Sequence, residues 1–237
     1  MMNTKFHVFD SPTTASYVFG RSREFLFEPV IASMMENGVN LPVVDRPKFQ
    51  MPLGPHHALS KEQQESKDFV STNHATYIKY LTGDLLDDIM MVYMDNFHAV
   101  LQDILDVRSD VWISVDLHEL MRKLIFETSA TTFFGTRLRE LWPKMWQDWK
   151  LFNDATFAGV RSNFAFYLQP RALAARERML RAFDKWVDCD VEEWDVADGV
   201  WNEKWGVRMN WEREALCRKS GFSLRGRACL QASFLFV

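Results

Sequence analysis

The chain has 237 residues, with 28 Lys and Arg against 32 Asp and Glu, so its formal net charge is −4. This balance provides no bulk positive field, which argues against a protein whose main role is to bind nucleic acid or an anionic membrane. The three cysteines lack CxxC or Cys–His spacing, so neither a structural zinc site nor a disulfide framework is predicted. The 19 Phe and nine Trp suit a thick helical core or an apolar pocket, and for most of them the core is the expected place.

The first part of the chain mixes element types. Residues Lys5–Phe9 alternate and are rich in β-formers, which predicts a short strand. Asp10, with a proline two residues later, predicts a helix that runs to about Phe19. Residues 24–38 form a further helix-like stretch, whereas the four prolines within 41–55 predict a loop.

Helices are predicted for most of the remaining chain. Apolar residues recur at steps of three and four through 85–104 and again through 116–134, where Gly135 is expected to end the helix. The arginines of residues 172–187 are expected to face water, opposite an apolar stripe. Residues 189–211 are acidic and rich in Trp, which predicts a surface connection. Further helices are expected at 61–81, 142–152, 172–187 and 210–219, and from Ser223 to the end of the chain.

General catalytic motifs do not occur in the sequence. GxSxG, GxxxxGK[ST] and GxGxxG are all missing, so neither a nucleophile elbow nor a phosphate-binding loop is predicted. His56 and His57 form the one histidine pair, for which an exposed loop position is expected rather than a metal site. No segment reaches about 18 uninterrupted apolar residues, and the first residues hold no apolar run, so neither a membrane anchor nor a signal peptide is expected.

A succession of segments resembles the cytochrome P450 family, in particular the branch of sterol 7α-hydroxylase and prostacyclin synthase. Residues 73–86 (NHATYIKYLTGDLL) are similar to the C-helix segment of that branch, and residues 93–101 (YMDNFHAVL) to its next helix. The segment from Trp112 to Gly135, with its closing Phe-Phe-Gly, resembles the following helical region. Residues 170–186 are similar to the F–G region that roofs the substrate pocket. Residues 221–237 resemble the opening of the long I helix in fungal members.

The resemblance implies a mainly α chain that forms an incomplete cytochrome P450 fold, from helix B to the start of helix I, with a short β element near the N-terminus. Residues 1–237 would be one partial domain, truncated at both ends. The parent enzyme would be a haem-thiolate monooxygenase with haem b and iron. It would oxygenate an apolar lipid-like or secondary-metabolite substrate with O2 and electrons from NADPH-cytochrome P450 reductase. The parent family resides at the endoplasmic reticulum membrane, whereas a chain without anchor or signal is expected to be cytoplasmic or of unknown location. No nucleic-acid partner is implied.

Two near-matches to family motifs are interpreted as coincidental. Glu119-Leu-Met-Arg122 fits the ExxR pattern, but the PERF-like segment that follows it in the family does not follow here. Phe222 to Cys229 imitates the cysteine loop. Arg225 and Gln231 stand where that loop needs glycine to turn under the porphyrin. No catalytic residue or metal ligand is therefore assigned, and haem b is not expected to be bound by this chain alone.

The remaining site assignments concern one cation and two aromatic residues. The WxxxR motif that grips a haem propionate does not occur, and Lys79 is the best remaining cation for that role, with a solvated lysine as the alternative. Phe234 and Phe236 are assigned to the substrate pocket. The alternative function is a non-catalytic helical remnant or a module that binds an apolar ligand, so whether this chain is itself an enzyme stays open.

Overall fold

The computed structural model describes Ser11 and residues 28–49, 61–105, 114–161, 164–189 and 199–236. Within these ranges the protein is mainly α, as the sequence predicts, with a single antiparallel pair of two-residue strands. The strand predicted at Lys5–Phe9 and the helix predicted from Asp10 to Phe19 lie outside the described ranges. No helix in the described part of the chain is long and apolar enough to cross a membrane.

The elements begin and end close to the positions that periodicity predicts, with three corrections. A short helix lies inside the predicted loop 41–55, a hairpin lies inside the predicted connection 189–211, and helical structure resumes after Gly135. The elements are α2 (Glu28–Ser33), η1 (Met34–Gly38), α3 (Arg46–Phe49), α4 (Lys61–Tyr80), α5 (Asp84–Leu105), α6 (Leu117–Leu141), α7 (Met145–Arg161), α8 (Phe164–Tyr167), α9 (Pro170–Val187), β1 (Trp201–Asn202), β2 (Gly206–Val207), α10 (Arg208–Lys219), α11 (Leu224–Ala232) and η4 (Ser233–Phe236).

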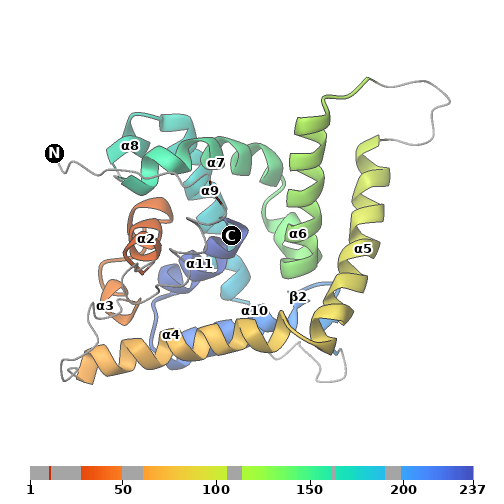
Figure 1. The fold of residues 1–237 in the computed structure, drawn as a ribbon. Helices are drawn as coiled ribbons and strands as arrows, with labels where there is room; N and C mark the ends of the chain where they lie inside the picture. The colour runs from red at the N-terminus through yellow and green to blue at the C-terminus, as the bar shows by residue number, and fades with distance from the viewer. Residues whose placement is uncertain are drawn as a thin grey trace.

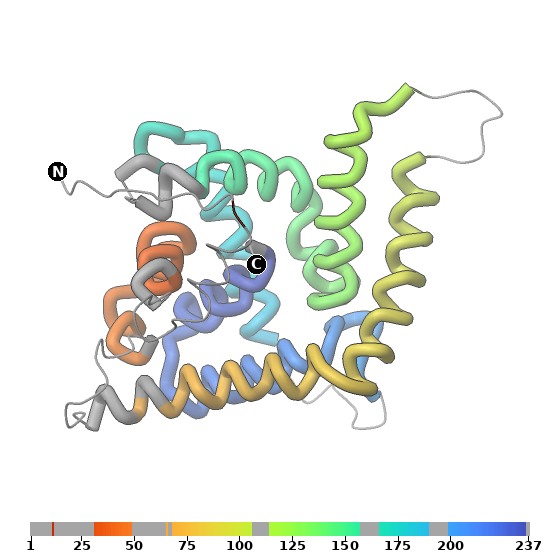
Figure 2. The backbone as a smooth tube through the Cα atoms, in the orientation of Figure 1, coloured from red at the N-terminus to blue at the C-terminus, as the bar shows by residue number. Residues whose placement is uncertain are grey.

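The helices enclose a centre that is occupied by α9 and α11. In Figure 1, α4 runs along the base, α5 rises from its end, and α6 returns beside α5. The smoothed trace in Figure 2 shows α2 and α3 on the opposite side, with the C-terminal end in the middle of the view. The main contacts of α9 are with α7 and α11, so the last helix of the described chain is a central element.

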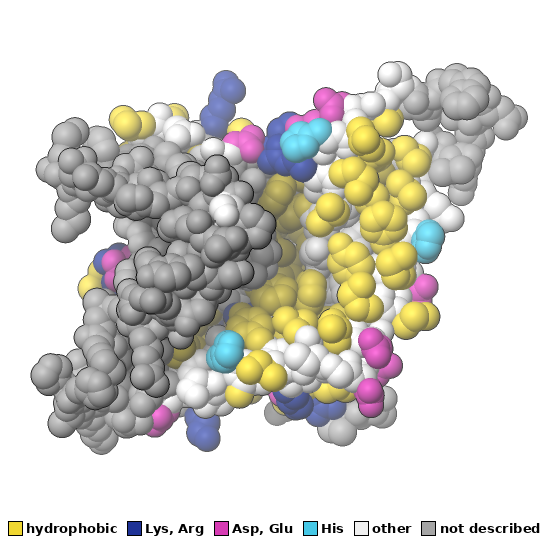
Figure 3. Space-filling model, in the orientation of Figure 1, with side chains coloured by type: hydrophobic (Ala, Val, Ile, Leu, Met, Phe, Trp, Pro, Cys, Tyr) yellow, Lys and Arg dark blue, Asp and Glu magenta, His cyan; other side chains and the backbone are white. Residues whose placement is uncertain are grey.

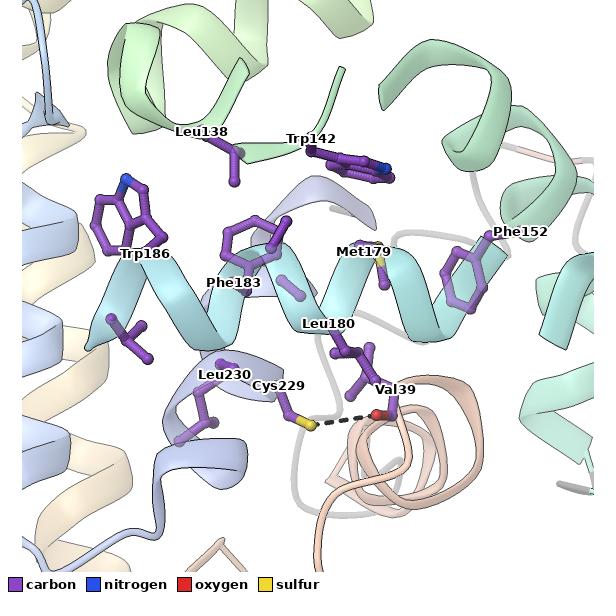
Figure 4. Close-up of a cluster of buried hydrophobic side chains, with 14 of the residues drawn as sticks. Val39, Leu138, Trp142, Phe152, Met179, Leu180, Phe183, Trp186, Cys229 and Leu230 are labelled. Atoms are coloured by element: carbon purple, nitrogen blue, oxygen red, sulfur yellow. Dashed lines mark hydrogen bonds between the residues drawn. The ribbon is translucent and has the colours of Figure 1, made fainter. Parts of the chain in front are cut away.

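The amphipathic α9 organises the main hydrophobic core. Its Met179, Leu180 and Phe183 are almost fully buried, and Figure 4 shows them between side chains of α7, α11 and the segment after η1. Trp186 lies edge-on to Phe134, at 5.5 Å between ring centroids. Because complete burial of one such side chain contributes about 1.5–3 kcal/mol, this stripe is a principal source of stability.

Arg176 departs from the expectation that the arginines of α9 face water. Its side chain is 1% exposed, and its guanidinium lies 4.4 Å from the centroid of Phe166. The same group donates to the carbonyl oxygens of Asn37 and Gly38 at 3.1 and 3.3 Å. These two carbonyls end η1, so Arg176 joins η1 to α9 through the kind of long-range contact that helical periodicity does not reveal.

Gly135 interrupts α6 without ending it. Its φ of 69° removes the helical geometry, and a Cβ there would collide with the backbone of Lys204 and Gly206. Beyond the break, the amide of Thr136 donates to the carbonyl of Glu203 at 2.9 Å, so α6 pairs with the hairpin. The carbonyls of Thr132, Phe133 and Phe134 accept from the side chains of Trp201 (3.0 Å), Asn210 (2.7 Å) and Trp186 (3.1 Å), respectively.

Helix α11 begins at a double cap. Ser223 is its N-cap and accepts from the amide of Gly226 at 3.1 Å, in agreement with the predicted helix start. Asp45, which is fully buried, accepts from the Ser223 amide at 3.1 Å, from the Ser223 hydroxyl, and from Lys48 at 3.0 Å. Burial by itself would raise the pKa of Asp45, but the hydrogen bonds from Ser223 and Lys48 lower the pKa below the ordinary value of an aspartate. A carboxylate from the segment before α3 therefore fixes the start of the central helix.

Candidate functional site

Phe234 lies at the junction of η4, α4 and α6, surrounded by aromatic rings. Its ring centroid is 4.5 Å from that of Phe133, 5.9 Å from that of Tyr77, and 6.4 Å from that of Phe134. We call these four residues the Phe234 cluster. Phe234 itself is only partly buried. The backbone of Phe236 belongs to η4, but its side chain lies outside the described part of the structure.

A buried cation borders the Phe234 cluster. Arg213 of α10 is 2% exposed, and its guanidinium lies 4.7 Å from the ring centroid of Tyr77 and 5.6 Å from that of Phe234. The guanidinium donates to neutral acceptors: Asn73 Oδ1 (3.2 Å), Asn210 Oδ1 (3.0 Å), Gln231 Oε1 (3.3 Å) and the carbonyl of Leu230 (2.9 Å). The site therefore combines aromatic faces with a positive charge held by uncharged groups.

No carboxylate within the described residues forms an ion pair with Arg213. The charge is balanced instead by carbonyl dipoles and by the faces of two rings, an arrangement in which cation–π attraction is strengthened by burial. Burial raises the pKa of Tyr77, although the Arg213 charge acts in the opposite direction, so its phenol keeps its proton at neutral pH. Arg213 therefore joins α10 to α4 and α11 and supports the rings of Tyr77 and Phe234 from the buried side.

Sequence reasoning did not identify Arg213. The residue lies within a helix that was predicted at 210–219, where a single arginine is expected to face solvent. The one available signal is Asn210, three residues earlier and therefore on the same helix face. Its importance depends on Gln231 and Asn73, which the fold brings in from α11 and α4.

Lys79, predicted for a haem propionate, has a partner within the protein. Its ammonium lies 2.8 and 2.9 Å from the two carboxylate oxygens of Glu212, and the hydroxyl of Tyr80 donates to the same carboxylate at 2.6 Å. The hydrogen bond to Glu212 raises the pKa of Lys79. The lysine side chain is 53% exposed. A propionate at this position would have to compete with Glu212.

Two of the three cysteines do not fit a haem thiolate. Cys229 is fully buried within α11, and its thiol donates to the carbonyl of Val39 at 3.2 Å, as Figure 4 shows. Burial raises the pKa of Cys229, and also that of Cys217, to about 12, which disfavours the thiolate. Cys189 follows α9, where its thiol donates to the Lys185 carbonyl at 3.1 Å. Neither Cys217 nor Cys229 presents the open thiolate that haem ligation requires. The described residues also hold no cluster of three or more His, Cys, Asp or Glu that could bind a metal ion.

Glu119 and Arg122 lie on the partly exposed side of α6, 3.7 Å apart. Arg122 donates to Asp154 at 2.9 Å, and Lys150 donates to Glu119 at 2.8 Å, so the group links α6 to α7. Such a partly exposed network is a structural link of modest strength. The pair His56–His57 lies outside the described residues.

Two surface pockets lie away from the predicted residues. The larger, of about 760 Å3, is bordered by α3, α4 and the end of α10, where Phe69 and Leu216 form apolar walls. The smaller, of about 380 Å3, lies at the start of α9 beside Asp154 and Arg171. Lys79 and Phe234 line neither of these two pockets. Figure 3 shows a different feature, a recess with a hydrophobic lining beside the paired helices α5 and α6.

Comparison with known proteins identifies no relative. No family model, no curated protein and no solved structure matches the chain.

Proposed function

We propose that this chain is the N-terminal portion of a cytochrome P450 monooxygenase that oxygenates an apolar, lipid-like or secondary-metabolite substrate. Support comes first from the order of the segments that resemble the family. The observation that carries the proposal is the position of α11, which corresponds to the predicted opening of the I helix. This helix lies against α9 and α10, with Ala228, Cys229, Leu230 and Gln231 all buried.

In this proposal Phe234 belongs to the apolar pocket of the parent enzyme. The segment that follows α11 brings Phe234 against Tyr77 and Phe133, so the end of the described chain contributes an aromatic wall. Arg213 would hold this wall in place from behind, because its guanidinium lies against the rings of Tyr77 and Phe234. These groups bind and orient a substrate, and the oxidative chemistry would depend on haem held by residues that this chain does not supply.

A second function is a module that binds an apolar ligand without haem. The same Phe234 cluster favours this candidate, since it needs no further group to accept a hydrophobic molecule. Neither function expects haem binding by the purified chain. The two functions differ in the coding sequence that follows Val237.

A haem titration separates the chain as it stands from a complete enzyme. Purified 1–237 mixed with haemin, reduced and exposed to CO, is expected to give no thiolate-type absorption band, because the candidate cysteine is buried with its pKa at about 12. A clear band that disappears in Cys229→Ala would overturn this expectation. A coding frame that continues beyond Val237 into ExxR and a cysteine loop would support the parent enzyme, and a frame without them would count against it.

Ligand binding tests the Phe234 cluster directly. The increase in fluorescence of a fatty-acid probe on titration with the chain is expected to be saturable. Phe234→Ala is expected to weaken probe binding about tenfold or more, because it removes a partly buried ring that contacts three others. Leu168→Ala is the matched control, since Leu168 is 70% exposed and lies outside the cluster. Equal affinities for the two variants would contradict a role for this site, and aggregation of the chain without saturable binding would count against the binding module.

A further inference from the structure

The pair of helices α5 and α6 presents an apolar face that no other described element covers. The main contacts of α5 are with α6, and with α4 at its beginning, so one side of the helix is packed and the other is open. Met90 and Met94 of α5 are 46% and 44% exposed, and Met121 and Ile125 of α6 are 38% and 49% exposed. Figure 3 shows hydrophobic side chains spread over both helices.

The spacing of these residues suits a helical partner. Met90 and Met94 are one turn apart, as are Met121 and Ile125, so each helix offers a short apolar ridge. An amphipathic helix that lies along both helices can bury its apolar side on these exposed residues. Methionine is unbranched and polarisable, which allows a surface of this kind to adapt to the side chains of a partner.

The charge beside the face is negative and largely uncompensated. α5 carries Asp84, Asp87, Asp88, Asp95 and Asp103 and contains no Lys or Arg. Asp84 and Asp87 lie in the first turn, where they interact favourably with the helix dipole. Asp103 lies 3.6 Å from Arg139. Neither Asp88 nor Asp95 forms an ion pair with any described residue, and both are exposed.

From the apolar ridges and this acidic edge, we propose that the α5–α6 face binds an amphipathic helix with basic residues along one side of its apolar stripe. The apolar stripe would contact Met90, Met94, Met121 and Ile125, and lysine or arginine side chains would meet Asp88 and Asp95. A symmetric second copy is disfavoured, because a twofold contact through this face would bring two acidic edges together. The proposal concerns a face apart from the Phe234 cluster and does not depend on haem.

A synthetic 18-residue helix of leucine and lysine, labelled with a fluorophore, is the probe. The full 237-residue chain is expected to bind it with saturable fluorescence anisotropy, and a peptide with glutamate at every lysine position is expected to bind at least tenfold more weakly. Raising the salt to about 0.5 M is expected to reduce affinity for the lysine peptide, because exposed charges are then screened.

Two variants separate the apolar and the charged contributions. Met94→Glu is expected to weaken binding of the lysine peptide at least tenfold, whereas Leu168→Glu, the same kind of change at a distant exposed site, is expected to leave it unchanged. The double variant Asp88→Lys with Asp95→Lys is expected to reverse the preference, so that the glutamate peptide binds more tightly. All four substituted positions are exposed, and far-UV circular dichroism identifies any variant that has lost its helices.

Three outcomes would overturn the proposal. The first is equal binding of the lysine and glutamate peptides to the unmodified chain. The second is an unchanged preference in the Asp88, Asp95 double variant with its circular dichroism spectrum preserved. The third is self-association in sedimentation that Met94→Glu abolishes, which would assign the face to a second copy of the chain. The proposal would be established by a reversed peptide preference in the double variant together with weakened binding of the lysine peptide by Met94→Glu.

Discussion

The contact between Asp45 and Gly226 predicts a specific non-additivity. Asp45 is fully buried and holds Ser223, the residue that caps the central helix α11. Asp45→Ala removes a charged acceptor from the amide and the hydroxyl of Ser223. Hydrogen bonds to charged groups contribute about 1.5–3 kcal/mol each and are not additive, so we expect a loss of about 3 kcal/mol in the free energy of unfolding.

Gly226→Ala disturbs the same contact from the other side. A Cβ on Gly226 would lie 2.7 Å from Cγ of Asp45 and closer still to one carboxylate oxygen. The methyl group would displace the carboxylate and lose about 3 kcal/mol of capping, while alanine in a helix recovers about 1 kcal/mol relative to glycine. The expected net loss is about 2 kcal/mol. In the Asp45→Ala background the obstacle is gone, so Gly226→Ala should instead stabilise by about 1 kcal/mol.

Urea unfolding of the four proteins, followed by tryptophan fluorescence, measures the cycle. The two single losses would sum to about 5 kcal/mol, but the double variant is expected to lose only about 2 kcal/mol. The sign of the Gly226→Ala effect in the Asp45→Ala background is the decisive result. If the methyl group destabilises both backgrounds equally, Asp45 does not restrict Gly226 and the double cap does not act as described.

Because the pKa of Asp45 is lowered in the folded state, its contribution to stability is present above about pH 4 and is lost as the pH falls through the folded-state pKa. Unfolding curves at pH 2–5 should therefore show a steeper loss of stability with acid for the wild type than for Asp45→Ala. A thiol reagent at pH 8 should modify only Cys189 in the folded chain and all three cysteines in denaturant, because Cys217 and Cys229 are buried with pKa values of about 12. Rapid labelling of more than one thiol in the folded chain would contradict the burial of Cys217 and Cys229. Arg213→Met should cost more than about 3 kcal/mol in urea unfolding, since four acceptors, three of them buried, lose their donor. A loss below about 1 kcal/mol would show that water replaces the guanidinium.

Local sequence patterns predicted much of the helical structure. The apolar spacing predicted 85–104, where α5 spans Asp84–Leu105, and Ser223 was recognised as the start of α11, where it is the observed N-cap. These features depend on side chains within one turn of each other, which a sequence displays directly. The same local reading misplaced the helix end at Gly135, because the segment beyond it is held by the hairpin.

The candidate site was less accessible to prediction. Phe234 was expected to line an apolar pocket, and the fold places it among aromatic rings. Its association with Arg213 depends on contacts between α4, α10 and η4, and more than a hundred residues separate α4 from the other two elements. Lys79 was chosen as a cation on the helix predicted at 61–81, and its partner Glu212 comes from a distant helix.

The sequence by itself therefore determined the mainly α character and most helix positions. The cysteine spacing predicted neither a disulfide nor a zinc framework. Such predictions are possible because composition, spacing and capping act over a few residues. Only the tertiary structure decided that Arg176 and Arg213 are buried, and that Asp45 caps a helix 178 residues away. Burying a charge becomes tolerable only when distant groups supply its hydrogen bonds. Those partners exist only once the chain has folded.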